Sequence, residues 1–106
     1  MGVIVITCFK PKEGMENELL EVIKDHIPVL RKEGLVTDRI CHVMRSSNGS
    51  ILEVFEWKSQ EAIENAHKNE RVLELWKRFE KACTYEKLSS LEESNMMFPG
   101  FEPVEF

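Results

Sequence analysis

The 106-residue sequence lacks a cluster of basic residues, a long apolar run and a regular set of cysteines. Fourteen Lys and Arg against 19 Asp and Glu give a net charge of −5, which argues against nucleic acid because phosphate binding depends on basic side chains. No apolar run approaches bilayer-spanning length, so we expect no membrane span. The first residues lack a charged leader, and Ile6 stands where N-myristoylation needs Ser or Thr, so we expect neither a signal peptide nor a lipid anchor.

The cysteines and histidines form no recognisable ligand set. Three cysteines are an odd number and are widely spaced, so neither a disulfide framework nor a metal knuckle is indicated. The three histidines fall on separate predicted elements without a metal-ligand spacing, and there is no glycine-rich phosphate loop. We therefore expect a cytoplasmic protein that needs no metal, haem or flavin.

The composition, 42% hydrophobic and 31% charged, is typical of a soluble globular protein, and the length suits one domain. We expect residues 1–94 to form this domain. Residues 95–106 contain Pro99, Gly100 and Pro103 and are predicted to be irregular. Because this tail is also rich in Met and Phe, we expect it to dock on the domain or on a dimer partner rather than lie in solvent.

Residues 35–58 predict a β-hairpin around which the chain is organised. Two apolar runs, 40–44 and 51–57, flank Asn48-Gly49, a dipeptide that supplies both positive-φ positions of a tight primed turn. With these two residues as the loop, His42 lies opposite Phe55. Because side chains alternate across a strand, one hairpin face then carries Ile40, His42, Met44, Glu53, Phe55 and Trp57.

The other elements follow from hydrophobic periodicity. Residues 3–9 predict a strand with two apolar faces, and residues from 15 onwards predict a helix, kinked or divided at Pro28 and closed at Gly34. Ser59 is a good N-cap for a second helix, which we expect to break at residues 67–69, where Asn69 caps its continuation. Residues 84–91 predict a fourth strand.

The element order is therefore β-α-β-β-α-β. This order predicts an α+β fold with a ferredoxin-like split βαβ sheet, antiparallel, with both helices on one face. The second sheet face is too apolar to remain in water, and a second copy of the chain is the economical cover. We therefore expect a homodimer.

Three stretches resemble the antibiotic biosynthesis monooxygenase family of the dimeric α+β barrel superfamily. They are the turn at 10–14, the block 53–62 (EVFEWKSQEA) and the Ala66-His67 pair that follows it. Residues 101–104 resemble an extension found in some members. The resemblance implies a dimeric α+β barrel with a pocket in each subunit. It also implies, for its best-known members, oxidation of polyphenols or quinols by O2 without a cofactor.

Another branch of that family degrades haem with an Asn on the first strand and a Trp and a His on the second helical segment. Those positions fall here on Thr7, Ala66 and Trp76, and none of them matches. The resemblance therefore does not extend to haem degradation.

His42 and Glu53 are the predicted catalytic residues. With the expected register they share one face, where Glu53 orients His42 as a general base that deprotonates a phenol. The alternative interpretation is a half-exposed strand histidine paired with a carboxylate for structural reasons.

The predicted substrate-binding residues are Thr7, Phe55, His67, Trp76 and Tyr85. Aromatic rings stack on aromatic ligands but are more often core, and His67 can simply cap the helix segment that ends there. The sequence thus predicts a cofactor-independent monooxygenase acting on a small aromatic polyphenol or quinol. The alternative is a non-catalytic dimeric barrel that binds a small apolar ligand.

Overall fold

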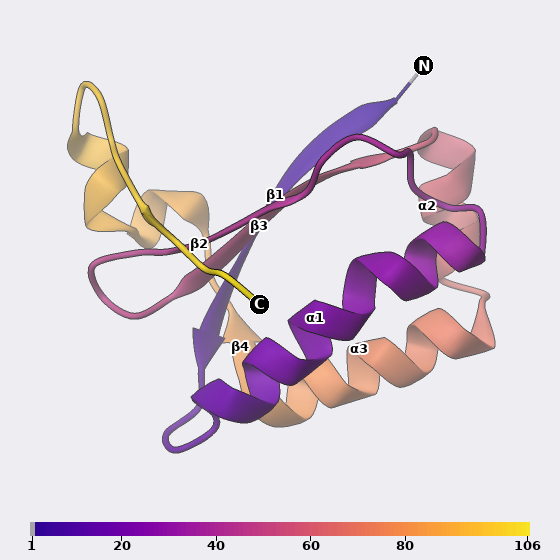
Figure 1. Cartoon of the computed structure of the whole chain (residues 1–106), viewed down its shortest axis with the longest axis horizontal. Helices are drawn as coiled ribbons and strands as arrows, with labels where there is room; N and C mark the ends of the chain where they lie inside the picture. The colour runs from indigo at the N-terminus through magenta and orange to yellow at the C-terminus, as the bar shows by residue number, and fades with distance from the viewer. Residues whose placement is uncertain (1) are drawn as a thin grey trace.

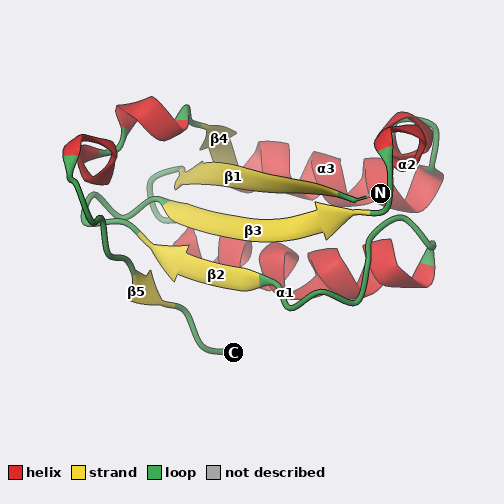
Figure 2. Cartoon of the chain, turned by 90° about the horizontal axis from the view of Figure 1, so that it is seen from above, coloured by secondary structure: helices red, strands yellow, loops and turns green. Residues whose placement is uncertain are grey.

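The computed structural model describes residues 2–106 and confirms the α+β, ferredoxin-like fold. Five strands form one antiparallel sheet in the order β4-β1-β3-β2-β5. The helices α1 and α3 lie side by side across one face of this sheet (Figures 1 and 2). The elements are β1 (Val3–Pro11), α1 (Glu16–Lys32), β2 (His42–Arg45), β3 (Ile51–Trp57), α2 (Gln60–Ala66), α3 (Glu70–Ala82), β4 (Cys83–Tyr85), the 3-10 turns η1 (Leu88–Ser90) and η2 (Glu92–Asn95), and β5 (Glu102–Pro103).

The helix ends follow the local sequence. Pro28 lies inside α1 without dividing it, and Gly34 takes a φ of +73° just after the helix, as a glycine at this position commonly does. The Ser59 side chain accepts a hydrogen bond from the Ala62 N–H at the start of α2. Asn69 caps α3 in the same way, so the predicted break between the two helices is confirmed.

The hairpin between β2 and β3 forms, but its predicted register is wrong by one residue. The Ser46 N–H donates to the Ser50 carbonyl at 2.8 Å, which leaves a three-residue loop instead of two. Within this loop only Gly49 has a positive φ, +91°, as in a type I turn that ends in a left-handed glycine. His42 therefore pairs with Val54 rather than with Phe55. A shift of one residue places every β2 side chain on the opposite face from the one expected.

The strand predicted at residues 84–91 ends at Tyr85, so the prediction is wrong for the rest of that segment. The chain instead folds back through η1 and η2 beneath the sheet face that the helices leave open. Leu91 is buried there in a small cluster with Cys8 and Leu52, against which Met44 and Phe101 pack. Part of the C-terminal tail then adds β5 to the edge strand β2 (Figure 2). This chain's own segment therefore covers one end of the second face.

The other end of that face is uncovered in the single chain. Ile4, Ile6 and Ile40 expose 57%, 49% and 76% of their surface. We call these three residues, with His42 and Val54 between them, the open sheet face. This face lies opposite the one that α1 and α3 cover, and no helix of residues 2–106 lies over it (Figure 2).

Glu93 fixes the returning segment to the hairpin loop. Its carboxylate accepts the Ser47 backbone N–H at 2.9 Å and the Ser46 hydroxyl at 2.8 Å. These bonds favour the charged form, so hydrogen bonding from the backbone N–H of Ser47, then from Glu93's own N–H and the Ser46 hydroxyl, lowers the pKa of Glu93.

We expect this attachment to weaken in acid. A carboxyl group whose pKa is lower in the folded state stabilises it above the unfolded pKa, here about 4.5, and loses that contribution as the pH falls through the lower folded value. The Glu93→Gln variant should therefore lose less thermal stability than the wild type between pH 6 and pH 3. Glu56→Gln is the control, since the pKa of Glu56 is also lowered but Glu56 does not touch the tail. If residues 88–95 lose protection from hydrogen exchange in acid to the same extent in wild type and Glu93→Gln, the weakening is not due to Glu93.

Candidate functional site

A buried histidine–carboxylate pair lies between the helix layer and the sheet. His26, on α1, contacts Glu53, on β3, with 2.7 Å between Nδ1 and Oε1. His26 is 4% exposed and Glu53 is completely buried. Ion-pairing groups of this kind are rarely buried so deeply unless they are paired, so the bond accounts for the presence of both.

The sequence places both side chains in this layer. His26 follows Val22 by four residues and Ile23 by three, so it lies on the buried stripe of α1. Glu53 pairs with Thr7 on β1 and with Val43 on β2, at the centre of the sheet. Its side chain points to the helix face.

The pair leaves one imidazole nitrogen free. When Nδ1 donates its hydrogen to the Glu53 carboxylate, Nε2 carries a lone pair and acts as an acceptor. Nε2 is the one buried side-chain nitrogen or oxygen without a hydrogen-bond partner among residues 2–106. A buried polar atom without a partner is costly, and in a functional site it is a position for a ligand atom.

His26 forms part of the wall of a cavity of about 260 Å³ between β1, β3 and α3, which we call the aromatic cavity. The His26 ring meets Phe55 and Phe79 edge-on, at centroid distances of 5.5 and 5.0 Å. The cavity is lined by Val5, Thr7, Phe9, His26, Phe55, Trp57, Trp76, Phe79 and Tyr85. Its volume and its aromatic walls suit one small aromatic ring.

Four of the five predicted substrate-binding residues line this one cavity: Thr7, Phe55, Trp76 and Tyr85. His67 is not on the wall, but its ring packs edge-on against Trp76 at 5.0 Å. Its Nδ1 lies 2.8 Å from the Ile63 carbonyl, which holds the ring in place. The structure therefore brings four of these five residues into the wall of one cavity, and the fifth packs behind it.

The predicted pairing of His42 with Glu53 is wrong. With the observed register, His42 is exposed on the open sheet face, whereas Glu53 is buried on the helix face. The partner of Glu53 is His26, a residue that our sequence analysis did not single out. The signal for it was present, because His26 falls on the apolar stripe of α1.

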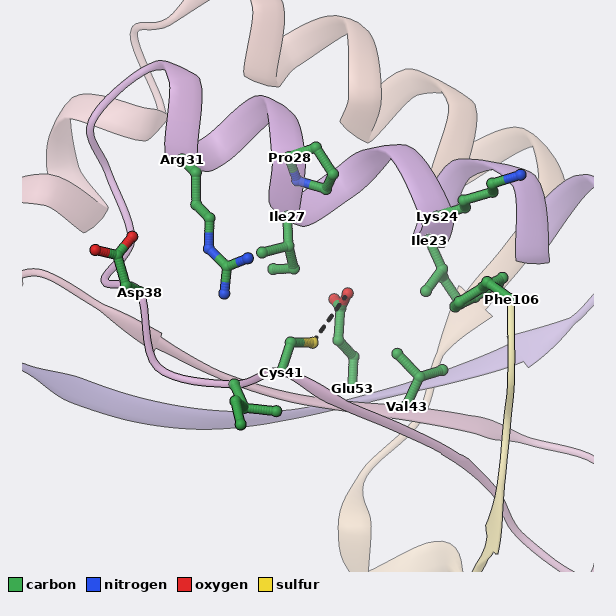
Figure 3. A pocket seen from close by; sticks show the side chains of 11 residues that line it. Ile23, Lys24, Ile27, Pro28, Arg31, Asp38, Cys41, Val43, Glu53 and Phe106 are labelled. Atoms are coloured by element: carbon green, nitrogen blue, oxygen red, sulfur yellow. Dashed lines mark hydrogen bonds between the residues drawn. The ribbon is translucent and has the colours of Figure 1, made fainter.

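Glu53 also borders a second cavity, of about 370 Å³, which we call the α1–β2 cavity (Figure 3). Its second carboxylate oxygen, Oε2, has the Cys41 thiol at 3.9 Å. Burial, followed by the charge of Glu53, raises the pKa of Cys41 to about 12, so this thiol stays protonated. The wall consists of Ile23, Lys24, Ile27, Pro28, Arg31, Asp38, Ile40, Cys41, Val43, Glu53 and Phe106.

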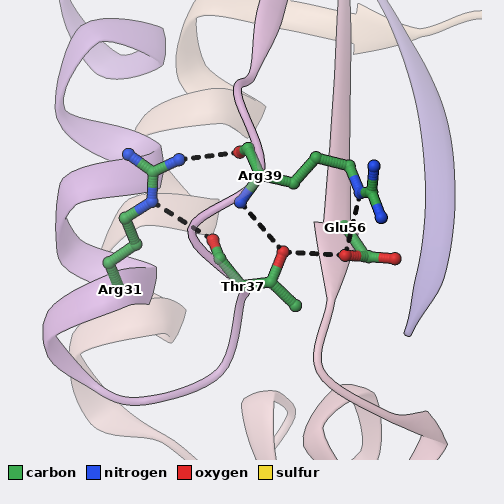
Figure 4. A network of polar contacts seen from close by, with 4 residues as sticks. All are labelled: Arg31, Thr37, Arg39 and Glu56. Carbon is green, nitrogen blue, oxygen red and sulfur yellow. Dashed lines mark hydrogen bonds and ion pairs between the residues drawn. The ribbon is translucent and has the colours of Figure 1, made fainter. Parts of the chain in front are cut away.

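The segment that joins α1 to β2, at the rim of this cavity, is fixed by a polar network (Figure 4). Arg31 donates to the backbone carbonyls of Thr37 and Arg39, at 3.3 and 2.9 Å. Glu56 accepts from the Thr37 hydroxyl at 2.8 Å and from Arg39 at 3.0 Å. The chain's own carbonyl groups therefore hold the Arg31 guanidinium in place at the cavity.

The part of the chain that the structure describes holds no group of three His, Cys, Asp or Glu side chains placed to bind a metal ion. Within residues 2–106, no helix is long and apolar enough to cross a membrane.

Comparison with known proteins supports the fold. No family model and no curated protein sequence matches the chain. Among solved structures, the chain is similar to Rv0793 from Mycobacterium tuberculosis, with a TM-score of 0.65 and 19% sequence identity. The match covers 79% of this chain and 85% of that one. The likeness thus extends over most of both chains and shows that they share the ferredoxin-like α+β fold.

Proposed function

We propose that the aromatic cavity binds a small polyphenol or quinol, and that the protein is a cofactor-independent monooxygenase of such a compound. The free Nε2 of His26 at the cavity wall carries this proposal. A ligand hydroxyl that donates to Nε2 satisfies a buried atom that otherwise has no partner. Glu53 keeps the imidazole in the tautomer that can accept the proton.

The proposed reaction begins with proton transfer from the ligand hydroxyl to Nε2 of His26. The resulting anion is electron-rich and transfers electrons to O2 directly. For a simple quinol the products are a hydroxyquinone and water: one oxygen atom enters a C–H bond and the other leaves as water. The quinol supplies all four electrons, so no external reductant is needed.

The surroundings of His26 favour this step. The flanking rings of Phe55, Trp57 and Phe79 place apolar surface beside the anion and its partner. Burial, followed by the charges of Cys83 and Glu80, raises the pKa of Tyr85, so its hydroxyl stays protonated at neutral pH. A phenol hydroxyl at this edge of the cavity can donate to a second oxygen of the substrate. The family resemblance in residues 53–62 points to the same chemistry.

Oxygen uptake is the test of this proposal. Purified protein should consume one O2 for each quinol or anthrone converted, without added metal or flavin, and the product should carry one added oxygen atom from ¹⁸O2. The alternative function is binding alone, since a buried Nε2 is satisfied equally by a ligand that never reacts. Saturable binding of a quinol, with no oxygen uptake for any quinol or anthrone tested, would establish that alternative.

We also propose that two copies of the chain pack through the open sheet face. Three isoleucines with about half or more of their surface exposed are unusual on one face of a monomer, and burying them removes apolar area from water. The resemblance to dimeric α+β barrels supports the same arrangement. In this arrangement the C-terminal tail, residues 95–106, lies at the edge of the contact between the two copies.

Sedimentation should give twice the chain mass of 12.4 kDa for the wild type. The double variant Ile4→Lys, Ile6→Lys should sediment as a folded monomer, because it places charges in the centre of the proposed contact. Leu73→Lys is the matched control, since Leu73 is an exposed apolar residue of α3, away from that face. A monomeric wild type would refute the dimer, and truncation after Ser94 tests whether the tail contributes to it.

A further inference from the structure

One carboxylate oxygen of Glu53, Oε2, lacks a strong hydrogen-bond donor among residues 2–106. Oε1 holds Nδ1 of His26 at 2.7 Å, whereas Oε2 has only the Cys41 thiol at 3.9 Å. A thiol is a weak donor, and a fully buried carboxylate normally accepts several stronger hydrogen bonds. Glu53 forms part of the wall of the α1–β2 cavity, with its carboxylate directed from β3 towards α1 (Figure 3).

We propose that the α1–β2 cavity is a second ligand site, which takes a small apolar molecule carrying one neutral hydroxyl group. The hydroxyl donates to Oε2 of Glu53, and the apolar part lies against α1 and β2. This site goes beyond the proposed monooxygenase. The two cavities share no wall residue, and the bond between His26 and Glu53 runs from the wall of one to the wall of the other.

The apolar part of the ligand follows from the walls. The side chains of Ile23, Ile27 and Pro28 line the cavity from α1, and Val43 lines it from β2. The volume of about 370 Å³ is within the range of small-molecule sites and fits a single substituted ring.

The neutral hydroxyl follows from the charges. Two cations, Lys24 and Arg31, and two anions, Asp38 and Glu53, line the same cavity. The Arg31 guanidinium is held there by the carbonyls of Thr37 and Arg39, so a positive charge is already present in the cavity wall. An ammonium group on the ligand would be repelled by that guanidinium, and a carboxylate would be repelled by Glu53. A hydroxyl supplies the missing donor without adding charge.

Two probes of the same shape test the site. The first is 4-methylphenol, which has a hydroxyl donor, and the second is 4-methylanisole, its methyl ether, which has none. Binding is followed by NMR on the methyl groups of Ile23, Ile27 and Val43, which report the α1–β2 cavity. The methyl groups of Val5 and the indole of Trp76 report the aromatic cavity in the same spectra.

We expect 4-methylphenol to shift the first set of signals saturably and to bind there roughly tenfold or more tightly than the ether, as for a hydrogen bond to a charged group. Glu53→Gln should reduce that preference. Val43→Phe should fill the cavity and abolish these shifts, while the Val5 and Trp76 signals still respond.

Equal binding of phenol and ether, shifts confined to Val5 and Trp76, or no saturable change at Ile23, Ile27 and Val43 would each overturn the proposal. The comparison of the two probes on the unmodified protein decides the matter even where a variant does not fold. Failure of the monooxygenase proposal appears elsewhere, in oxygen uptake and at the aromatic cavity.

Discussion

Replacing His26 by leucine is expected to cost about 3–5 kcal/mol of folding free energy at pH 7, which is the typical cost of removing one member of a buried ion pair. The reason is the carboxylate that remains. Glu53 is completely buried, and without His26 its strongest remaining side-chain contact is the Cys41 thiol at 3.9 Å. The double variant His26→Leu, Glu53→Leu should recover most of the loss, because an apolar pair of similar volume replaces the charged one. Urea unfolding of the two single variants and the double variant gives the coupling energy directly.

The exposed pair of Arg78 and Asp25 is the control for this cycle. Its atoms are 3.0 Å apart, but the two side chains are 47% and 49% exposed. Water and salt screen such pairs, so its coupling energy should be below about 1 kcal/mol. If the losses in the His26 and Glu53 variants simply add, with no more coupling than this surface pair shows, the buried pair is not the electrostatic unit inferred here.

The layers of the fold could be predicted because each helix and strand carries a clear local pattern. The caps at Ser59 and Asn69 and the glycine after α1 are decided within a few residues of chain, and all three are confirmed. The hairpin register was not decided locally. Asn48-Gly49 suits a two-residue loop as well as a three-residue loop in which only the glycine is left-handed.

The choice between these two loops involves a contact from far along the chain. Glu93 binds the Ser46 hydroxyl and the Ser47 N–H, which lie more than forty positions earlier in the sequence. That contact favours the longer loop. Neither the path of residues 86–101 nor the burial of Leu91 on the second sheet face leaves a periodic signal, so the sequence pattern did not predict them.

The residues that line the aromatic cavity were placed correctly from the sequence, whereas the histidine that pairs with Glu53 was not. Aromatic side chains on β3 and α3 face the layer between sheet and helices because hydrophobic periodicity places them there, and this holds for Phe55 and Trp76. The base was assigned through the hairpin register, and a one-residue error moved His42 to the other face. The more reliable signal was a histidine on an apolar helix stripe, which needs a buried partner wherever it occurs.

The two histidines therefore give opposite expectations for the proposed reaction. His26→Gln should lower the rate of quinol oxidation by about 10²- to 10⁴-fold, the usual contribution of a general base. Glutamine suits this test because its amide can still donate to Glu53, so the buried carboxylate keeps a partner while the base is removed. His42→Gln, the matched control, should oxidise quinol at the wild-type rate, since His42 is exposed on the opposite face of the sheet.

Oxygen uptake and circular dichroism on the same samples separate loss of the base from loss of the fold. A folded His26→Gln protein with an unchanged rate would exclude His26 as the base. An equal loss in both variants would mean that the reaction depends on the open sheet face as well, where His42 lies. Selective loss in the His26 variant instead assigns the proton transfer to the imidazole that Glu53 holds, because the two substitutions are chemically identical and differ only in the face of the sheet on which the histidine lies.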